Sequence, residues 1–103
     1  MKPIFIPLKR CYFEAFERGD KTHEYRRDVP RWSHKNVFPG RPVTLSLGYG
    51  KKNRLSAEVV SRKCSWMSSM DWINCYGTSG WGVDIELKVF ADRATDKDAK
   101  EGK

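Results

Sequence analysis

Apolar and polar residues alternate most clearly near the end of the chain. Apolar side chains occupy every second position at Trp81, Val83, Ile85, Leu87 and Val89. A period of two predicts a β-strand over residues 81–89 with one buried face. The same alternation predicts strands over residues 42–48 and from Leu55 to about Ser65.

A helical period appears once, early in the chain. Leu8, Tyr12, Phe13 and Phe16 recur at a spacing of three to four, with charged residues between them. This pattern predicts an amphipathic helix over residues 8–18 whose aromatic stripe joins the core. The expected core combines side chains from this helix and the strands: Phe16, Leu45, Leu47, Val83, Ile85 and Leu87.

Short extended segments flank the predicted helix. Residues 4–6 form a strand that Pro3 and Pro7 confine to a strand end or a sheet edge. Gly19 ends the helix because glycine adopts the left-handed conformation without a steric penalty. A second extended segment follows over residues 21–27.

Two stretches show no clean period. For residues 28–41 we expect a long ordered loop with one helical turn around residues 32–36. For residues 66–80 we expect a short helix or an irregular lid. One early helix and roughly five to six short strands, without a βαβ rhythm, predict one small α+β barrel domain over residues 1–90. Residues 91–103 are polar and charge-balanced, which predicts a disordered tail.

The net charge of +7 lies entirely on the predicted domain, where 16 Lys or Arg residues face 9 Asp or Glu residues. Such a domain attracts polyanions, of which nucleic-acid phosphate is the commonest. The alternative is a basic surface that only keeps the protein soluble. Charge alone does not decide between the two.

The sequence has no apolar run of about 18 residues and no secretory signal pattern, so no membrane partner is expected and the cytoplasm is the predicted compartment. Cys11, Cys64 and Cys75 are widely spaced and form no CxxC pair, which is typical of reduced thiols. No metal site and no cofactor are expected, because the His and Cys residues lack a ligand spacing.

The most informative stretch is residues 19–26, Gly-Asp-Lys-Thr-His-Glu-Tyr-Arg. On an extended segment Thr22, Glu24 and Arg26 share one face, while Lys21, His23 and Tyr25 share the other. The spacing G-x-K-x-x-E-x-R after a first helix resembles the signature of ASCH domains, a branch of the PUA-like barrels. The likeness covers roughly residues 3–90, and the opening segment and Glu-Tyr-Arg-Arg also resemble small phage- or prophage-encoded members.

The resemblance implies a PUA-like barrel that binds RNA or a nucleotide in a cleft near the first helix. Some members are single-strand ribonucleases, and one branch deacetylates acetylcytidine. That branch is similar to this chain at Gly19, Lys21, Thr22 and Arg26, but it has a threonine where this chain has Glu24. Its reaction also needs a carboxylate from the segment between the last two strands, where Asp71 is the acid present.

Lys21 and Glu24 are the candidate catalytic residues, Lys21 as a base or phosphate ligand and Glu24 as a proton acceptor. Surrounding positive charge is expected to favour the ionised form of Glu24. Arg26 binds a phosphate or pairs with Glu24, and Tyr25 and Trp32 stack a base or belong to the core. The candidate nucleic-acid-binding set is Lys21, Glu24, Tyr25, Arg26, Trp32, Arg41, Lys51, Lys52 and Arg54.

Three functions fit these observations. The first is a module that binds single-stranded RNA or a nucleotide through the basic cleft. The second is a hydrolase of RNA or a modified nucleoside, which also needs an acid and a base within hydrogen-bond reach. The third is an interaction module whose basic face binds an acidic protein partner of unknown identity.

Overall fold

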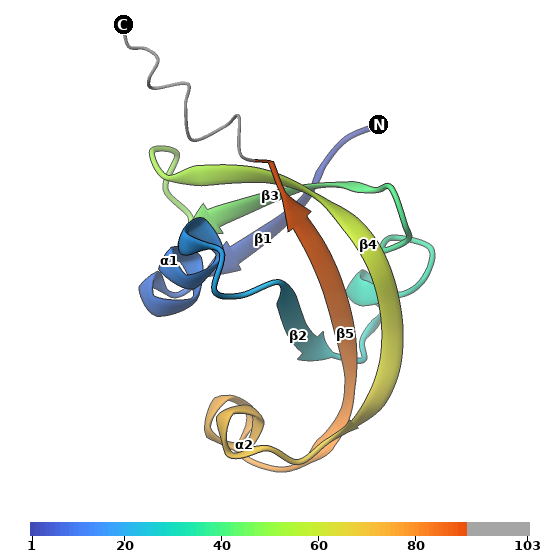
Figure 1. Ribbon diagram of the computed structural model, residues 1–103. Helices are drawn as coiled ribbons and strands as arrows, with labels where there is room; N and C mark the ends of the chain where they lie inside the picture. Colours follow the sequence, from blue (N-terminus) through green and yellow to red (C-terminus); the bar gives the residue numbers. More distant parts are fainter. Residues whose placement is uncertain (91–103) are drawn as a thin grey trace, which may run out of the picture.

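The computed structural model describes residues 1–90, in which five β-strands and two α-helices form an α+β fold (Figure 1). The elements in chain order are β1 (Ile4–Leu8), α1 (Arg10–Arg18), β2 (His23–Arg27), the 3-10 turn η1 (Pro30–Trp32), β3 (Pro42–Leu47), β4 (Arg54–Met67), α2 (Met70–Tyr76) and β5 (Gly80–Val89). The predicted α+β class is therefore confirmed. The disordered tail predicted at 91–103 lies outside the described residues.

The strands form one mixed sheet in the order β1-β3-β4-β5-β2. β1 runs parallel to β3, and every other neighbouring pair is antiparallel. Within residues 1–90 no backbone hydrogen bonds join the outer strands β1 and β2, so the sheet is open. The closed barrel stays a prediction.

β1 is an edge strand, as its flanking prolines predict, but it runs two residues further than expected. Pro7 lies inside the strand and pairs in register with Ser46 of β3. Proline has no backbone N–H to give to a second neighbour, so this position suits a strand with a neighbour on one side only.

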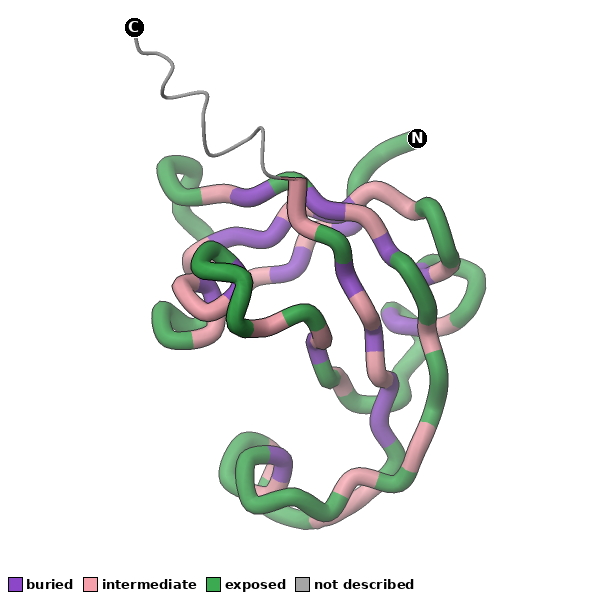
Figure 2. Tube along the Cα trace, in the orientation of Figure 1, coloured by how far each residue is buried: buried purple, intermediate pink, exposed green. Residues whose placement is uncertain are grey.

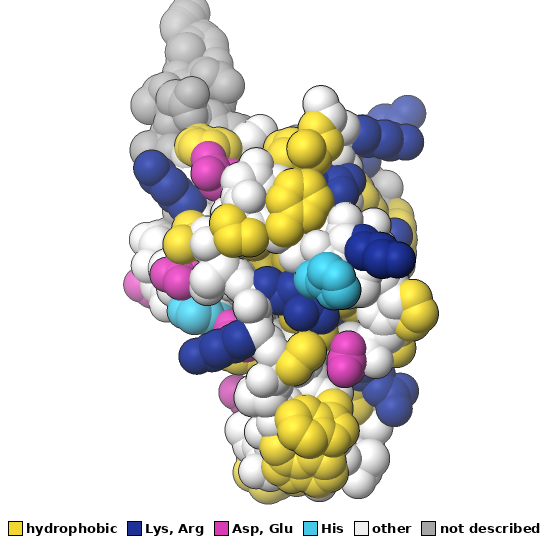
Figure 3. Space-filling view, turned by 90° about the vertical axis from the view of Figure 1, so that its right-hand side faces the viewer, with side chains coloured by type: hydrophobic (Ala, Val, Ile, Leu, Met, Phe, Trp, Pro, Cys, Tyr) yellow, Lys and Arg dark blue, Asp and Glu magenta, His cyan; other side chains and the backbone are white. Residues whose placement is uncertain are grey.

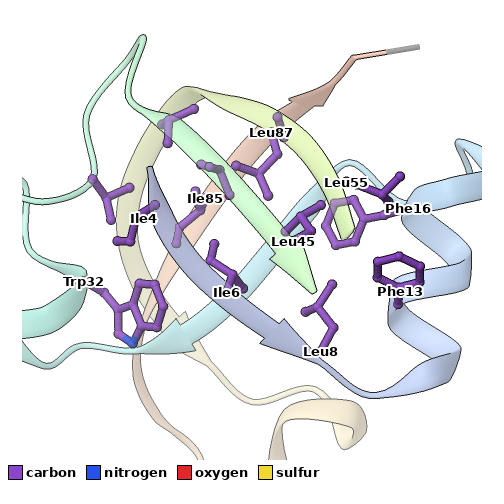
Figure 4. Packing of buried hydrophobic residues seen from close by; sticks show 14 of the residues in the cluster. Ile4, Ile6, Leu8, Phe13, Phe16, Trp32, Leu45, Leu55, Ile85 and Leu87 are labelled. Carbon is purple, nitrogen blue, oxygen red and sulfur yellow. The ribbon is translucent and has the colours of Figure 1, made fainter. Parts of the chain in front are cut away.

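The core lies between the curved sheet and α1 (Figure 2). Figure 4 shows Phe13 and Phe16 pointing from α1 toward Leu45 and Leu55, with Trp32 at the far end of the cluster. The core residues expected from the sequence are buried, except that Leu47 is only partly buried against the cluster. Strand alternation and the helix stripe thus identify the same interior.

β4 and β5 extend beyond this core as a long hairpin. Residues 54–58 of β4 pair with β3, and residues 57–67 pair with β5, with a bulge between Val59 and Ser61. For residues 66–80 the sequence predicts either a short helix or an irregular lid. The structure contains a helix there, α2, with Ser69 as its N-cap and Gly77 as its C-cap. The Ser69 side chain accepts a hydrogen bond from the Trp72 N–H at 3.2 Å, which caps the helix.

The predicted loop at residues 28–41 is ordered around η1. The turn that follows is closed by a hydrogen bond from the Val37 N–H to the Ser33 carbonyl at 2.8 Å. Trp32 and Val37 are both buried and tie the loop to the core. Among residues 1–90, neither helix has the length and apolarity that a membrane crossing requires.

Replacing Ile85 by alanine should lower the free energy of unfolding by about 2–5 kcal/mol, because Ile85 is 0% exposed and its loss leaves a cavity. Urea denaturation measures this change. Val60→Ala is the control, since Val60 is an exposed β-branched residue on the neighbouring strand β4 and its truncation should cost within about 0.5 kcal/mol. Equal effects of both substitutions would contradict the assigned core.

Candidate functional site

The motif segment is positioned by the end of α1. Gly19 has a φ of 85°, and its N–H donates to the Phe16 carbonyl at 3.1 Å. The N–H groups of Asp20 and Lys21 both donate to the Ala15 carbonyl, at 2.9 and 3.2 Å. These bonds fix the turn against the last turn of α1, so β2 leaves the helix in one direction.

The register of β2 against β5 sets the direction of the motif side chains. Glu24 lies opposite Ile85 and Arg26 lies opposite Val83, so both belong to the face that carries the core. Tyr25 lies opposite Asp84 on the other face. The predicted separation of the two faces is therefore present within β2, while Lys21 lies before the strand begins.

Arg26 is held from three sides. Its Nε donates to Glu24 Oε2 at 2.7 Å, and its Nη2 donates to the backbone carbonyl of Pro7 at 2.8 Å. Its guanidinium also lies 5.1 Å from the ring centre of Trp32. The ion pair with Glu24 is thus formed, and the same guanidinium bridges the two edge strands β2 and β1.

Glu24 is 7% exposed, and burial raises the pKa of its carboxyl above the usual 4.5. The charges of Arg26 and Lys21 and the hydrogen bond from Arg26 lower the same pKa, but the loss of water outweighs them. The positive charges therefore favour the ionised form of Glu24, as expected, but burial outweighs them and the net pKa is raised. The cations are in place, but the carboxyl is buried more deeply than the strand pattern indicates.

Lys21 lies among aromatic rings. Its ammonium lies 5.4 Å from the ring centres of Tyr12 and Phe16 and 5.2 Å from the ring centre of Tyr25. Each such cation–π contact contributes about 0.5–1 kcal/mol at an exposed site. The three rings restrain a long, flexible side chain in one place.

Lys21, Glu24 and Arg26 line a cleft of about 750 Å³ between α1, the edge of β2 and α2. Figure 1 shows α1 and α2 on the same side of the molecule, α2 below α1, with β2 at a height between them. The cleft takes its lining from five parts of the chain: Pro7, Leu8, Lys9, Tyr12, Lys21, Glu24, Tyr25, Arg26, Trp66, Met67, Ser68, Ser69, Asp71, Trp72, Cys75 and Tyr76.

The two helices meet across this cleft through Tyr12 and Cys75. The Tyr12 hydroxyl lies 3.9 Å from the Cys75 Sγ. This hydrogen bond, together with burial, raises the pKa of Tyr12 to about 12. Burial is the main cause that raises the pKa of Tyr25 and Tyr76 as well. The three phenols therefore keep their protons at neutral pH and can donate hydrogen bonds into the cleft.

α2 is anchored to the hairpin by Trp72. A Cβ at Gly82 would lie 2.7 Å from the Trp72 Cη2 and 2.6 Å from the Met67 Cγ, so only glycine lets the indole pack this closely on β5. The Tyr76 ring lies 4.4 Å from the Trp72 ring. The Trp72 Nε1 is buried and has no hydrogen-bond partner among residues 1–90, and an unpaired buried N–H costs about 1–3 kcal/mol.

Four of the residues predicted to bind nucleic acid line the cleft: Lys21, Glu24, Tyr25 and Arg26. The other five lie elsewhere. Trp32 is a core residue beneath Arg26 and presents no open face for a base. Lys51 and Lys52 are exposed in the turn between β3 and β4.

Arg41 and Arg54 hold the backbone together away from the cleft. The Arg41 guanidinium donates to the carbonyl of Lys2 at 2.8 and 3.1 Å and to the carbonyl of Asn36 at 3.1 Å. Arg54 Nε donates to the Gly50 carbonyl at 3.3 Å. The Arg41 guanidinium is therefore used within the fold, and Arg54 commits one of its N–H groups there.

Sequence reasoning missed the aromatic wall that Tyr12, Trp72 and Tyr76 contribute to the cleft. Tyr12 belongs to the amphipathic stripe, and the stripe does not distinguish a core position from a cleft wall. Asp71, noted as the acid of its segment, does line the cleft. His23 lies on the opposite face, where its Nδ1 is 2.6 Å from Asp84 Oδ1.

Among residues 1–90, no three His, Cys, Asp or Glu side chains come together as ligands for a metal ion. Comparison with known protein families finds no family model that matches this chain, and no curated protein matches it. The site is therefore interpreted from its own geometry.

Replacing Gly82 by alanine should destabilise the protein by about 1–3 kcal/mol, because the new methyl group overlaps the Trp72 ring and displaces α2. Thermal or urea unfolding measures the change. Gly80→Ala is a matched control on the same strand, since a Cβ there meets no atom within 4 Å. If Gly82→Ala were as stable as Gly80→Ala, the close packing of Trp72 would be wrong.

The raised pKa of Glu24 predicts a pH dependence with a definite sign. A carboxyl whose pKa is higher in the folded state binds its proton more tightly there, so it contributes stability at low pH and loses it as pH rises above about 4.5. The free energy of unfolding of the parent should therefore fall relative to that of Glu24→Gln between pH 4 and pH 7. If the free energy of unfolding of the parent instead rose relative to that of Glu24→Gln between pH 4 and pH 7, burial would not raise the pKa of Glu24.

Proposed function

We propose that this protein binds single-stranded RNA or a nucleotide in the cleft between α1 and α2. The observation that carries the proposal is the arrangement of Lys21, whose ammonium lies among three aromatic rings in the lining of a cleft that also contains Glu24. A cation binds a phosphate, aromatic faces stack on a base, and a carboxylate accepts hydrogen bonds from the donor edge of that base.

Each part of a nucleotide has a partner in this cleft. Lys9 and Lys21 attract a phosphate, and the protonated phenols donate hydrogen bonds to its oxygens. The rings of Tyr12 and Tyr25 offer faces on which a base stacks. Arg26 occupies Glu24 Oε2, and the other carboxylate oxygen receives no hydrogen bond from residues 1–90, so it can accept one from a base amino group or a ribose hydroxyl.

The ASCH resemblance supports the same ligand class. The element order, with a helix between the first two strands and the Gly-Lys-Glu-Arg segment at the start of β2, fits that of a PUA-like barrel. On this proposal the gap between β1 and β2 is the barrel seam, and Arg26 spans it through the Pro7 carbonyl. Three free, exposed cysteines support a reducing compartment such as the cytoplasm.

One observation favours a second function, hydrolysis of RNA or a modified nucleoside. Glu24 is a buried carboxyl with a raised pKa inside the cleft, which is a common property of catalytic acids and bases. Lys21 and Asp71 line the same cleft. Product formation from RNA oligomers or acetylcytidine, abolished by Glu24→Gln, would establish an enzyme, and binding without product would establish a module.

Replacing Lys21 by alanine should weaken binding of single-stranded RNA and lower the slope of log affinity against log salt by about 0.7, the value expected for one phosphate contact on a single strand. The fold should persist, because the backbone of Lys21 and not its side chain closes the turn. Fluorescence anisotropy at several salt concentrations measures both quantities.

The matched control is Lys35→Ala, which removes one positive charge from an exposed position outside the cleft. Arg26→Lys tests the second cation, since lysine keeps the charge but cannot bond Glu24 and Pro7 with a planar fork. If Lys21→Ala binds RNA like Lys35→Ala, or if the parent binds neither RNA nor nucleotide at low salt, the cleft is not a nucleic-acid site. An acidic protein partner then becomes the leading interpretation.

A further inference from the structure

Two exposed tryptophans lie at the outer end of the β4–β5 hairpin. Trp66 and Trp81 are opposite each other in register, and they are 56% and 60% exposed. Their ring centres are 5.8 Å apart at an interplanar angle of 87°. Figure 3 shows hydrophobic side chains gathered at the lower end of the molecule, which in Figure 1 is the end where β4 and β5 meet α2.

The position of this tryptophan pair follows from strand alternation. Trp81 lies on the same face as Val83 and Ile85, which are fully buried, but it is beyond the end of the core. Within residues 1–90, more than half of the surface of each tryptophan stays uncovered. Large apolar side chains exposed together on a protein surface commonly mark a binding site.

The tryptophan pair is continuous with the cleft. Trp66 is one of the residues that line it. Arg26 lies opposite Val83, so Trp81 is its diagonal neighbour on the same face, at about 7–8 Å between backbones. A ligand that extends out of the cleft past Arg26 therefore reaches the two indoles.

We propose that the tryptophan pair stacks the base next to the nucleotide held in the cleft, so that the ligand is a single strand of at least two nucleotides. This inference rests on the proposed function. In a perpendicular pair, the ring that presents its edge keeps both of its faces uncovered by the other, and a base can stack there. The net charge of +7 favours a polyanionic strand over an uncharged apolar partner.

The test compares ligand lengths on the parent and on Trp81→Ala, because Trp81 belongs to the pair but not to the cleft lining. The ligands are the four ribonucleoside monophosphates and the four matching RNA homotrinucleotides, measured by calorimetry. In the parent, a trinucleotide should bind roughly 5- to 150-fold more tightly than its mononucleotide, the gain expected from stacking one base. Trp81→Ala should lose most of this gain and keep the mononucleotide affinity.

Two controls separate stacking from a loss of structure. Trp81→Phe retains an aromatic face and should retain most of the gain. Tyr49→Ala removes an exposed aromatic ring from the turn between β3 and β4, outside the cleft lining, and should change nothing. Tryptophan emission should be quenched by trinucleotides more than by mononucleotides, because Trp32 and Trp72 are each 5% exposed and the two exposed tryptophans form the pair.

Equal affinity gains in the parent and Trp81→Ala, or no gain with length in the parent, would overturn the inference while leaving the cleft proposal intact. Absence of binding at every length would instead overturn the cleft proposal, and the stacking role with it. If sedimentation shows that the parent self-associates and Trp81→Ala does not, with no dependence on ligand length, the pair is a contact between copies of the chain.

Discussion

In residues 1–90, the two edge strands of this sheet are joined by a hydrogen bond from one side chain. Arg26 on β2 reaches the Pro7 carbonyl on β1, and Glu24 holds its guanidinium in that direction. A ladder of backbone hydrogen bonds between β1 and β2 would have closed the sheet and left no gap between these strands. A guanidinium closes it at one point and leaves room for a cleft, so the candidate site exists because the sheet is joined by a side chain and not by a strand pair.

The local features of the fold could be predicted from the sequence. A glycine at a helix end and a period of two each depend on neighbours within a few residues, so the end of α1 at Gly19 and the buried face of β5 follow directly. The faces assigned to Glu24 and Arg26 are also present, because alternation fixes them once the segment is extended.

The composition of the cleft could not be predicted in the same way. It depends on which strands become neighbours and on where α2 lies, and neither is encoded in a local period. Trp72 reaches its place because Gly82, ten residues later on another element, has no side chain. For the same reason, charge and aromaticity alone predict Arg41 and Trp32 at the site, whereas the partners that hold them lie in distant parts of the chain.

The free edge of β1 is protected against association with other chains. Arg26 and Arg31 donate to the carbonyls of Pro7 and Phe5, each at 2.8 Å, and Pro7 has no N–H to offer. An exposed edge strand normally templates intermolecular β-pairing, which leads to aggregation. Here a second molecule would have to displace two charged hydrogen bonds from a strand that lacks one of its donors. The β1 edge of the open sheet is therefore a poor template for fibrils.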